Sequence, residues 1–325
     1  HSKSIISLDI FIKDAFYLLI DNDMTLAGVY PVNNEFFTKD TITTDLRFLV
    51  GHPKYAKSKK DGFEIALNKN SKRDIIKSLW IGSHLNNISE LTLMSWLRLD
   101  YQVELYIDTL NLPKYMDKYR KSGQLIFKSI REIMSYDKGD EILPYSDLFR
   151  YKLLYKTGGT WCDMDMVLLK RLPKDNIIIS SEHTFQSGAF KSKLTFVPNI
   201  GVLRFPPGDQ FLENLIFKIE HRLKPAEFCD NMIVFRKLLK NHQYFQYISP
   251  PNMYCPLPWW NCKEMYYSDH YKIKYDVKNM TNKEILNSAV GLHLWNNFSM
   301  NKHNIDFTLA NQDSLYNSLY NIIFN

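Results

Sequence analysis

Residues 146–167 read Ser146-Asp-Leu-Phe-Arg150-Tyr-Lys-Leu-Leu-Tyr-Lys-Thr-Gly158-Gly159-Thr-Trp161-Cys-Asp163-Met-Asp165-Met-Val. The order of residue types predicts a short helix, a glycine stop and a strand that carries two aspartates two positions apart. Because side chains alternate between the faces of a strand, Asp163 and Asp165 are expected to point the same way. Two carboxylates at one point suit an oxygen-preferring divalent cation, which would bridge the protein to a phosphorylated substrate.

Strands alternate with helices around this stretch. The expected strands lie at 74–80, 103–107, 125–127, 161–169 and 176–180. The expected helices lie at 88–99, 113–122, 147–156, 211–223 and 231–239. Ser146 follows Pro144 and is expected to cap the helix over 147–156, which Gly158 and Gly159 end. The alternation predicts an α/β fold.

The first 71 residues differ from residues 72–325 in the pattern of their apolar segments. Short apolar segments separated by turn signals lie at 4–12, 16–20, 26–32, 46–50 and 63–67. Segments of this length between turns fit strands better than long helices. We therefore expect a small β-rich N-terminal part over 1–71, whose role the sequence does not reveal, followed by one larger domain over 72–325.

The composition narrows the functional classes. The 325 residues are 45% hydrophobic and carry a net charge of +6, with no dense basic block beyond 54–60. We expect no nucleic-acid binding, and the mild positive charge suits anionic nucleotide substrates. No run approaches the ~18 apolar residues of a membrane span. The oligomeric state and the compartment stay open, the latter being cytoplasmic, or Golgi-lumenal if an anchor precedes His1.

The four cysteines show neither a CxxC pair nor a zinc spacing. A disulfide between Cys255 and Cys262 remains an alternative to free thiols. Strand alternation would turn Cys162 away from the two aspartates, so this thiol is expected in the core rather than at a metal.

The composite of residues 146–167 resembles the sugar-binding region of the DXD glycosyltransferases of family 32. This family includes initiating mannosyltransferases, the α-1,4-galactosyltransferase that makes globotriaosylceramide and, more remotely, the glucosylating clostridial toxins. Their pattern runs Ser-Asp, Arg-Tyr, Leu-Tyr, Gly-Gly, an aromatic residue and Asp-x-Asp, and every element is present here. The resemblance spans about residues 73–301. It implies a GT-A-type nucleotide-binding domain with a mixed, mostly parallel sheet.

The resemblance assigns roles within this stretch. Asp163 and Asp165 would hold Mn²⁺ or Mg²⁺ and the nucleotide diphosphate, with Asp165 the direct ligand and Asp163 nearer the ribose. Asp147 and Arg150 share a helix face and would grip the sugar ring, although a plain intrahelical salt bridge is the alternative. Asp163, Asp165 and Arg150 are the expected catalytic residues. Trp161 stands where Tyr is usual, so either packing or ligand contact is open for it.

Two further segments resemble the family. Residues 75–82 match an opening strand that ends in Ile-Trp-Ile-Gly, and ligands bind beyond the carboxyl ends of such strands. Trp80 is expected to stack on the nucleobase, with Ile81 beside it, unless Trp80 is a core residue. Residues 196–211 match a later segment in which an Asn, here Asn199, precedes a strand of small residues.

The segment Gly291-Leu-His293-Leu-Trp295-Asn296 resembles the C-terminal His-x-Trp-Asn of the galactosyltransferase branch. His293 and Trp295 are expected to share a strand face and to reach the metal or the diphosphate, with His293 as a third metal ligand and Asn296 beside the nucleotide sugar. A structural role for His293 is the alternative.

The resemblance thus implies a metal-dependent, retaining glycosyltransferase that moves a hexose from a nucleotide sugar to a glycan or glycolipid hydroxyl. The His-x-Trp-Asn ending favours a UDP-sugar, with GDP-mannose second. A same-face mechanism is our hypothesis, because the sequence shows no evident nucleophile beyond the metal pair. The alternatives are a catalytically silent nucleotide- or sugar-binding protein and a toxin-like enzyme that glycosylates a protein. A phosphohydrolase is disfavoured, because its Asp-x-Asp usually ends the first strand.

Overall fold

The computed structural model describes residues 4–7, 16–20, 26–31, 73–108, 111–137, 141–185, 194–222, 230–268, 270–272 and 279–324. The chain divides into two compact units, His1–Ser71 and Lys72–Asn325. In the first unit, β1 (Ser4–Ser7), β2 (Phe16–Ile20) and β3 (Leu26–Pro31) form an antiparallel sheet in that order. The strands expected at 46–50 and 63–67 lie outside the described residues.

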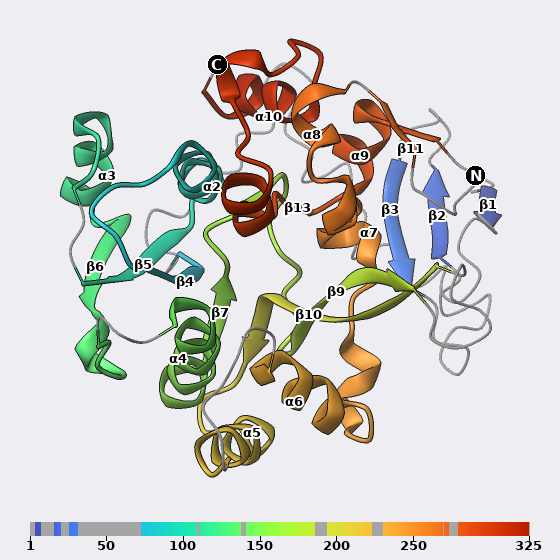
Figure 1. Cartoon of the computed structure of the whole chain (residues 1–325). Helices are drawn as coiled ribbons and strands as arrows, with labels where there is room; N and C mark the ends of the chain where they lie inside the picture. The colour runs from blue at the N-terminus through green and yellow to red at the C-terminus, as the bar shows by residue number, and fades with distance from the viewer. Residues whose placement is uncertain are drawn as a thin grey trace. The chain divides into compact units, whose positions relative to one another are not determined.

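The second unit is built on a six-stranded sheet (Figure 1). In spatial order its strands are β6 (Leu125–Ser129), β5 (Gln102–Ile107), β4 (Ile75–Trp80), β7 (Gly159–Cys162), β10 (Leu194–Phe205) and β9 (Ile178–Phe185). The pairs β6–β5, β5–β4 and β4–β7 are parallel, whereas β10 is antiparallel to both β7 and β9. The expected α/β class with a mixed, mostly parallel sheet is confirmed.

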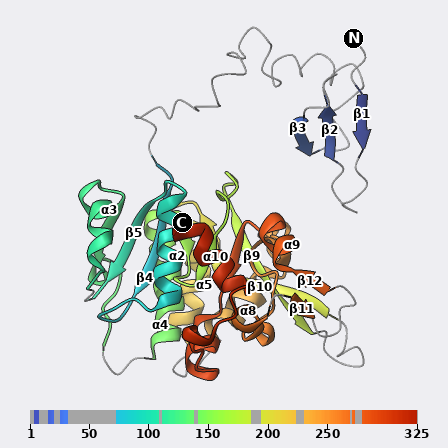
Figure 2. The same ribbon diagram turned by 90° about the horizontal axis from the view of Figure 1, so that it is seen from above.

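Helices cover both faces of this sheet (Figure 1). On one face lie α4 (Ile142–Thr157), α5 (Gln210–Glu220) and α6 (Asp230–Leu239). On the other lie α2 (Asn87–Arg98) and α10 (Leu315–Phe324), side by side in Figure 2, together with α8 (Glu264–Tyr267). Smaller elements are α3 (Asp117–Lys121), α7 (Pro251–Tyr254), α9 (Asn282–Ser288), β11 (His270–Lys272) and β12 (Asn279–Thr281). In the described part of the chain, no helix has both the length and the apolar character that a bilayer crossing needs.

Each face has its own apolar core. Trp96 of α2 belongs to one core, and Phe149 of α4 and Phe235 of α6 belong to the other. Along β7 the alternation of side chains sends Cys162 into the first core and Trp161 into the second. Cys162 is fully buried and is therefore a core residue, as expected.

Helix α4 is longer than the sequence indicated. It begins at Ile142 after Glu141, so Ser146 lies inside it and is not its N-cap. The reason is that Pro144 stands in the first turn, where the N–H that proline lacks would have no partner within the helix. The end of α4 at Gly158 is as predicted.

The carboxyl end of α4 is fastened to β4 by a buried lysine. Lys77 donates from Nζ to Thr157 Oγ1 and to the Gly158 carbonyl, each at 2.7 Å. An ammonium at this end of a helix is favoured by the helix dipole. Burial nevertheless lowers the pKa of Lys77. The contact fixes the point at which the chain leaves α4 and enters β7.

The prediction of one continuous strand over 161–169 is wrong, because the structure has two separate strands there. Strand β7 ends at Cys162, and Met166 N–H donates to Asp163 O at 2.9 Å, which closes a turn. The chain then enters β8 (Met166–Leu168), which pairs with β13 (Gly291–His293) in a separate two-stranded sheet. The apolar residues 166–169 continue the strand pattern in sequence, but their partner is a segment far along the chain.

Gly158 is predicted to tolerate no side chain. Its φ of 59° and ψ of −167° disfavour an L-residue, and an added Cβ would lie 2.5 Å from Pro207 Cδ and 2.6 Å from Pro207 N. We expect Gly158→Ala to lower the free energy of unfolding by about 2 kcal/mol or more, measured by urea denaturation. Gly123→Ala is the control, since Gly123 has φ of 72° but open space around it, and about 1 kcal/mol is expected there. Equal losses would contradict the steric argument.

Candidate functional site

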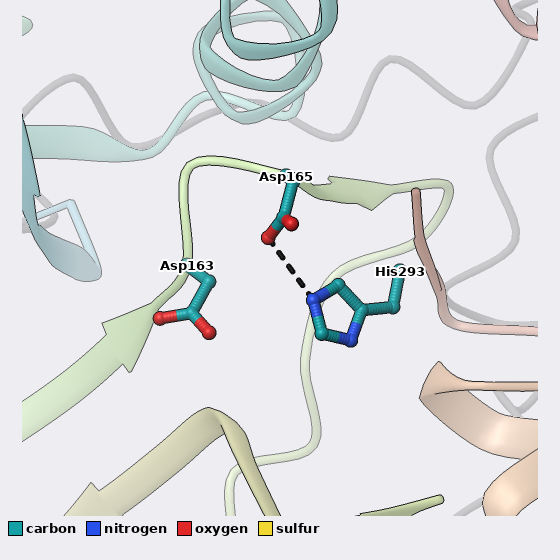
Figure 3. A group of neighbouring side chains, drawn as sticks. All are labelled: Asp163, Asp165 and His293. Atoms are coloured by element: carbon teal, nitrogen blue, oxygen red, sulfur yellow. Dashed lines mark ion pairs between the residues drawn. The ribbon is translucent and has the colours of Figure 1, made fainter. Parts of the chain in front are cut away.

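Asp163, Asp165 and His293 converge at the end of β7. Figure 3 shows Asp163 where β7 ends and Asp165 just before β8, on either side of the turn, with His293 facing Asp165. One ligand atom from each residue lies within 4.8 Å of the others. The two carboxylates therefore meet as expected, but the turn brings them together and strand alternation does not.

Asp165 is held from the C-terminal segment. Its Oδ1 lies 3.1 Å from His293 Nε2, and its Oδ2 accepts a hydrogen bond from the Asn296 backbone N–H at 2.8 Å. Burial opposes both charges, but each partner favours the charge of the other. The pKa of Asp165 is consequently lowered, and that of His293 is raised well above its ordinary value. Without a metal, the two residues form a buried ion pair.

His293 is supported on its far side by residues that fix its ring. Its Nδ1 lies 3.8 Å from Cys255 Sγ, and its ring lies 3.9 Å from that of Trp295, centroid to centroid. Trp295 itself lies beyond β13, with φ of 52°, and its Nε1 donates to Leu257 O at 3.1 Å. The prediction that His293 and Trp295 share a strand face is therefore wrong. The indole N–H of Trp295 donates to a backbone carbonyl and so is not available to a ligand.

The alternative of a disulfide between Cys255 and Cys262 is also wrong. Both residues are free and fully buried. The Cys255 thiol is instead a neighbour of the His293 ring, and burial raises its pKa.

Asp163 is fixed on one side and open on the other. Its Oδ1 accepts from Trp161 Nε1 at 2.7 Å and lies 2.9 Å from Arg150 Nη1. Its backbone N–H donates to Gly201 O at 2.8 Å. Within the described residues nothing donates to Asp163 Oδ2, which leaves that oxygen available to a cation. The indole of Trp161 thus supplies a hydrogen bond from a position where the family usually has a phenol.

Arg150 connects the sugar-binding candidates to the Asp-x-Asp turn. It is buried, and its Nη2 lies 3.2 Å from Asp147 Oδ1 while its Nη1 pairs with Asp163 and donates to Ile200 O at 2.7 Å. Its guanidinium also lies over the Trp161 ring, 5.0 Å from the centroid. Burial raises the pKa of Asp147 to about 6, although Arg150 opposes this and Asp163 adds to it. The intrahelical pair with Asp147 exists, but it is one part of a larger network.

The remaining candidates are Trp80, Ile81 and Asn296. Trp80 ends β4, is partly buried against the first core, and no described residue accepts a hydrogen bond from its Nε1. Ile81 packs partly buried against the second core. Asn296 reaches the site with its backbone, and its Oδ1 accepts from Asn86 Nδ2 at 2.9 Å. Among the described residues, no hydrogen bond or ion pair joins Trp80 to the Asp163–Asp165 network.

Several neighbours of the site were not predicted from the sequence. Asn86 caps α2 through its Oδ1 and holds Asn296, Cys255 touches His293, and Gly201 accepts from Asp163. A signal existed for Gly201, because it lies in the family-like segment over residues 196–211. Nothing in the local sequence marks Asn86 or Cys255.

The donor set fits a divalent cation. Two carboxylates and an imidazole suit Mn²⁺, and the carboxylate oxygens alone suit Mg²⁺. To coordinate through Nε2, His293 would have to release the proton that now pairs it with Asp165. If it keeps that proton, it orients Asp165 as a hydrogen-bonded neighbour of the metal.

Replacing the buried Arg150 is predicted to destabilise the folded protein. Arg150→Met would leave the Asp147 and Asp163 carboxylates without their shared guanidinium, so we expect a loss on the order of 3 kcal/mol in the free energy of unfolding. Arg131→Met is the control, because Arg131 is exposed, and a change within about 0.5 kcal/mol is expected. Chemical denaturation measures both. A midpoint for Arg150→Met equal to that of the unmutated protein would contradict the network.

The ion pair of His293 predicts a pH dependence of stability. A histidine whose pKa is raised by folding stabilises the folded state fully below its unfolded pKa of about 6.5, and this stabilisation is lost as pH rises through the folded value. In EDTA, His293→Gln should therefore lose more stability relative to the unmutated protein at pH 6 than at pH 9. His303→Gln, at an exposed position, should show no such trend. A difference that grows with pH would refute the assigned ion pair.

Comparison with known proteins bears on the same region. Residues 57–184 match the family described as the glycosyltransferase sugar-binding region containing the DXD motif. No curated protein matches the chain. Among solved structures, the chain resembles the PaToxG glycosyltransferase, with 12% identity over 54% of this chain and 69% of that chain and a TM-score of 0.33.

Two further solved structures resemble the chain at similarly low sequence identity. One is the apo-form glycosyltransferase GlyE of Streptococcus pneumoniae TIGR4, with 14% identity over 56% of this chain and 46% of that chain and a TM-score of 0.33. The other is the UDP-bound glycosyltransferase domain from the YGT toxin, with 12% identity over 45% of this chain and 61% of that chain and a TM-score of 0.29. Likenesses this distant assign neither donor nor acceptor.

The family match therefore carries the identification. It includes β4, α4 and the turn that bears Asp163 and Asp165, and it agrees with the composite motif of residues 146–167. Placement in family 32 stays a prediction. The part of the chain that carries Asp163 and Asp165 thus resembles the DXD-containing sugar-binding region of glycosyltransferases.

Proposed function

We propose that this protein is a metal-dependent, retaining glycosyltransferase that moves a hexose from a nucleotide sugar to a hydroxyl of a glycan or glycolipid. The observation that carries the proposal is the meeting of Asp163, Asp165 and His293 at the carboxyl end of β7. The two aspartates lie inside the matched residues 57–184, and His293 reaches them from the C-terminal segment. A cation bound there would neutralise the negative charge that develops on the leaving diphosphate. Open α/β sheets bind ligands at this edge.

Each residue of the network has a distinct part in the proposal. Asp165 binds the cation directly, and His293 with the Asn296 N–H fixes its carboxylate. Asp163 offers Oδ2 to the cation or to the ribose, because Trp161 and Arg150 engage its Oδ1. Arg150 and Asp147 bind hydroxyls of the donor sugar, one as donor and the other as acceptor. Trp80, at the end of β4, covers the base.

The donor is proposed to be a UDP-sugar, with GDP-mannose as the second choice. The support is the His293-Leu-Trp295-Asn296 ending, which resembles the galactosyltransferase branch. The same resemblance favours a glycan or glycolipid acceptor over a protein acceptor of the toxin type. A toxin-like enzyme remains the alternative.

Retention is proposed to proceed by attack of the acceptor on the same face from which the diphosphate leaves. Two buried or partly buried carboxylates lie near the Asp-x-Asp turn, and both are paired with a guanidinium: Asp147 with Arg150, and Glu182 with Arg236. A carboxylate held in this way is a poor nucleophile, which supports a mechanism without a covalent intermediate. Detection of a glycosylated carboxylate by mass spectrometry of the trapped enzyme would exclude it.

A catalytically silent nucleotide-binding protein is the rival from another class. The paired carboxylates of Asp163 and Asp165 argue against it, because such a protein would not need them. Calorimetry with UDP separates the two: the enzyme should bind UDP only with Mn²⁺ or Mg²⁺ present, whereas metal-independent binding without donor hydrolysis would favour the rival.

Removing one charge at Asp165 is predicted to stop turnover. Asp165→Asn keeps the volume and should lower Mn²⁺-dependent hydrolysis of the preferred donor on the order of 10²–10³-fold, as expected when one charged contact to the transition state is lost. The assay is a panel of UDP-glucose, UDP-galactose, UDP-N-acetylglucosamine and GDP-mannose. Asp175→Asn, which alters an exposed carboxylate, should retain full activity. Near-normal hydrolysis by Asp165→Asn would refute the assignment.

A further inference from the structure

Glu182 on β9 is a buried carboxylate that the proposed function does not use. Only 12% of its side chain is exposed. Its Oε2 accepts from Asn199 Nδ2 at 2.6 Å, and its Oε1 accepts from Arg236 Nη2 at 2.9 Å. Arg236, on α6, also donates from Nε to Pro198 O at 2.7 Å. The guanidinium therefore binds both Glu182 and the backbone just before Asn199.

Pro198 and Asn199, which Arg236 and Glu182 bind, lie at the start of an irregularity in β10. The register of β10 against β9 shifts between residues 198 and 203, as in a β-bulge. Side chains replace the missing ladder bonds there. Ser180 Oγ donates to Asn199 O and accepts from Val202 N–H, each at 3.0 Å, and Asn199 Oδ1 accepts from Gly201 N–H at 2.7 Å. The bulge is thus shaped by side chains, with Asn199 bonded to both strands.

The opposite side of the bulge contacts the catalytic candidates. Ile200 O accepts from Arg150 Nη1 at 2.7 Å, and Gly201 O accepts from Asp163 N–H at 2.8 Å. Gly201 also lies close to the Asp163 carboxylate, since an added Cβ would be 3.4 Å from Asp163 Oδ2 and 2.9 Å from Asn199 Oδ1. A displacement of the bulge would therefore move both Arg150 and Asp163.

We propose that Glu182 and Arg236 are positioning residues of the donor site. Glu182 binds the Asn199 side chain, and Arg236 binds the Pro198 carbonyl. These contacts fix the bulge, whose carbonyls at residues 200 and 201 bind Arg150 and Asp163. Neither residue needs to touch the substrate. The inference rests on the proposed function, because it assigns the placement of Asp163 to cation and nucleotide binding.

A purely structural role makes a different prediction. If the Glu182–Arg236 pair only joins α6 to β9, its loss lowers stability and leaves the folded site unchanged. If it positions the bulge, its loss weakens cation binding in protein that is still folded. Residues that orient metal ligands from outside typically change metal affinity by about 10–100-fold when mutated.

The test compares Glu182→Ala and Glu182→Gln with a matched control. Glu220→Ala removes the carboxylate of the more exposed Lys152–Glu220 pair at the end of α5, which has no hydrogen bond or ion pair to residues 198–203 among the described residues. Binding of Mn²⁺ in the presence of UDP is followed by the electron paramagnetic resonance signal of free Mn²⁺, at a temperature where all variants are folded. We expect Glu182→Ala to bind about 10-fold more weakly or worse, and Glu220→Ala to bind normally.

Glu182→Gln keeps an oxygen for Asn199 and the volume of the side chain, so it provides a result if Glu182→Ala does not fold. We expect its affinity to fall between those of the unmutated protein and the alanine variant. Unchanged Mn²⁺–UDP affinity in a folded Glu182 variant, even with a lower melting temperature, would overturn the inference.

A second readout does not depend on the metal. The Trp161 indole N–H donates to Asp163 Oδ1, so the NMR signal of this N–H, assigned with Trp161→Phe, reports the placement of that carboxylate. It should shift in Glu182→Gln and not in Glu220→Ala. If the unmutated protein fails to bind Mn²⁺ and UDP, the proposed function fails. A shifted indole signal would then still support positioning of Asp163 by Glu182, and an unshifted one would refute it.

Discussion

The buried guanidinium of Arg150 is the interaction on which the site depends. A positive charge away from water is tolerated only when it is paired and hydrogen-bonded, and Arg150 meets that condition through Asp147, Asp163 and Ile200 O. These three groups come from α4, from the end of β7 and from β10. One side chain therefore fixes the relative positions of a helix and two strands at the point where the two aspartates meet.

The rest of the site is arranged around the turn that follows β7. The turn directs Asp165 toward β13, where His293 and the Asn296 N–H hold it, while Asp163 stays with Arg150 and Trp161. The two carboxylates are thus restrained by segments far apart in the sequence, Asp163 by Arg150 of α4 and Asp165 by residues 293–296. Among the described residues, no protein group donates to Asp163 Oδ2, so this oxygen is available to the proposed cation.

Much of this domain was predictable from the sequence, for physical reasons. Alternating strand and helix patterns predicted most elements of residues 74–239. The stop at Gly158 was predicted correctly, because the positive φ at this helix end favours glycine. The turn at Asp163 was not predictable, because apolar residues follow it without a break and β8 pairs only with the distant β13. The start of α4 was misread because Pro144 is harmless in a first turn. Glu182 and Arg236 gave no signal, since their partnership depends on tertiary structure alone.

The proposed function depends on Asp163 and Asp165 together holding a divalent cation against a nucleotide diphosphate. The most direct measurement is anomalous diffraction at the manganese edge from crystals grown with Mn²⁺ and UDP. The proposed site predicts one strong peak within coordination distance of Asp165 and close to Asp163 Oδ2, with the diphosphate on its other side. UDP bound elsewhere, or bound at this edge of the sheet without a peak between the two carboxylates, would contradict it.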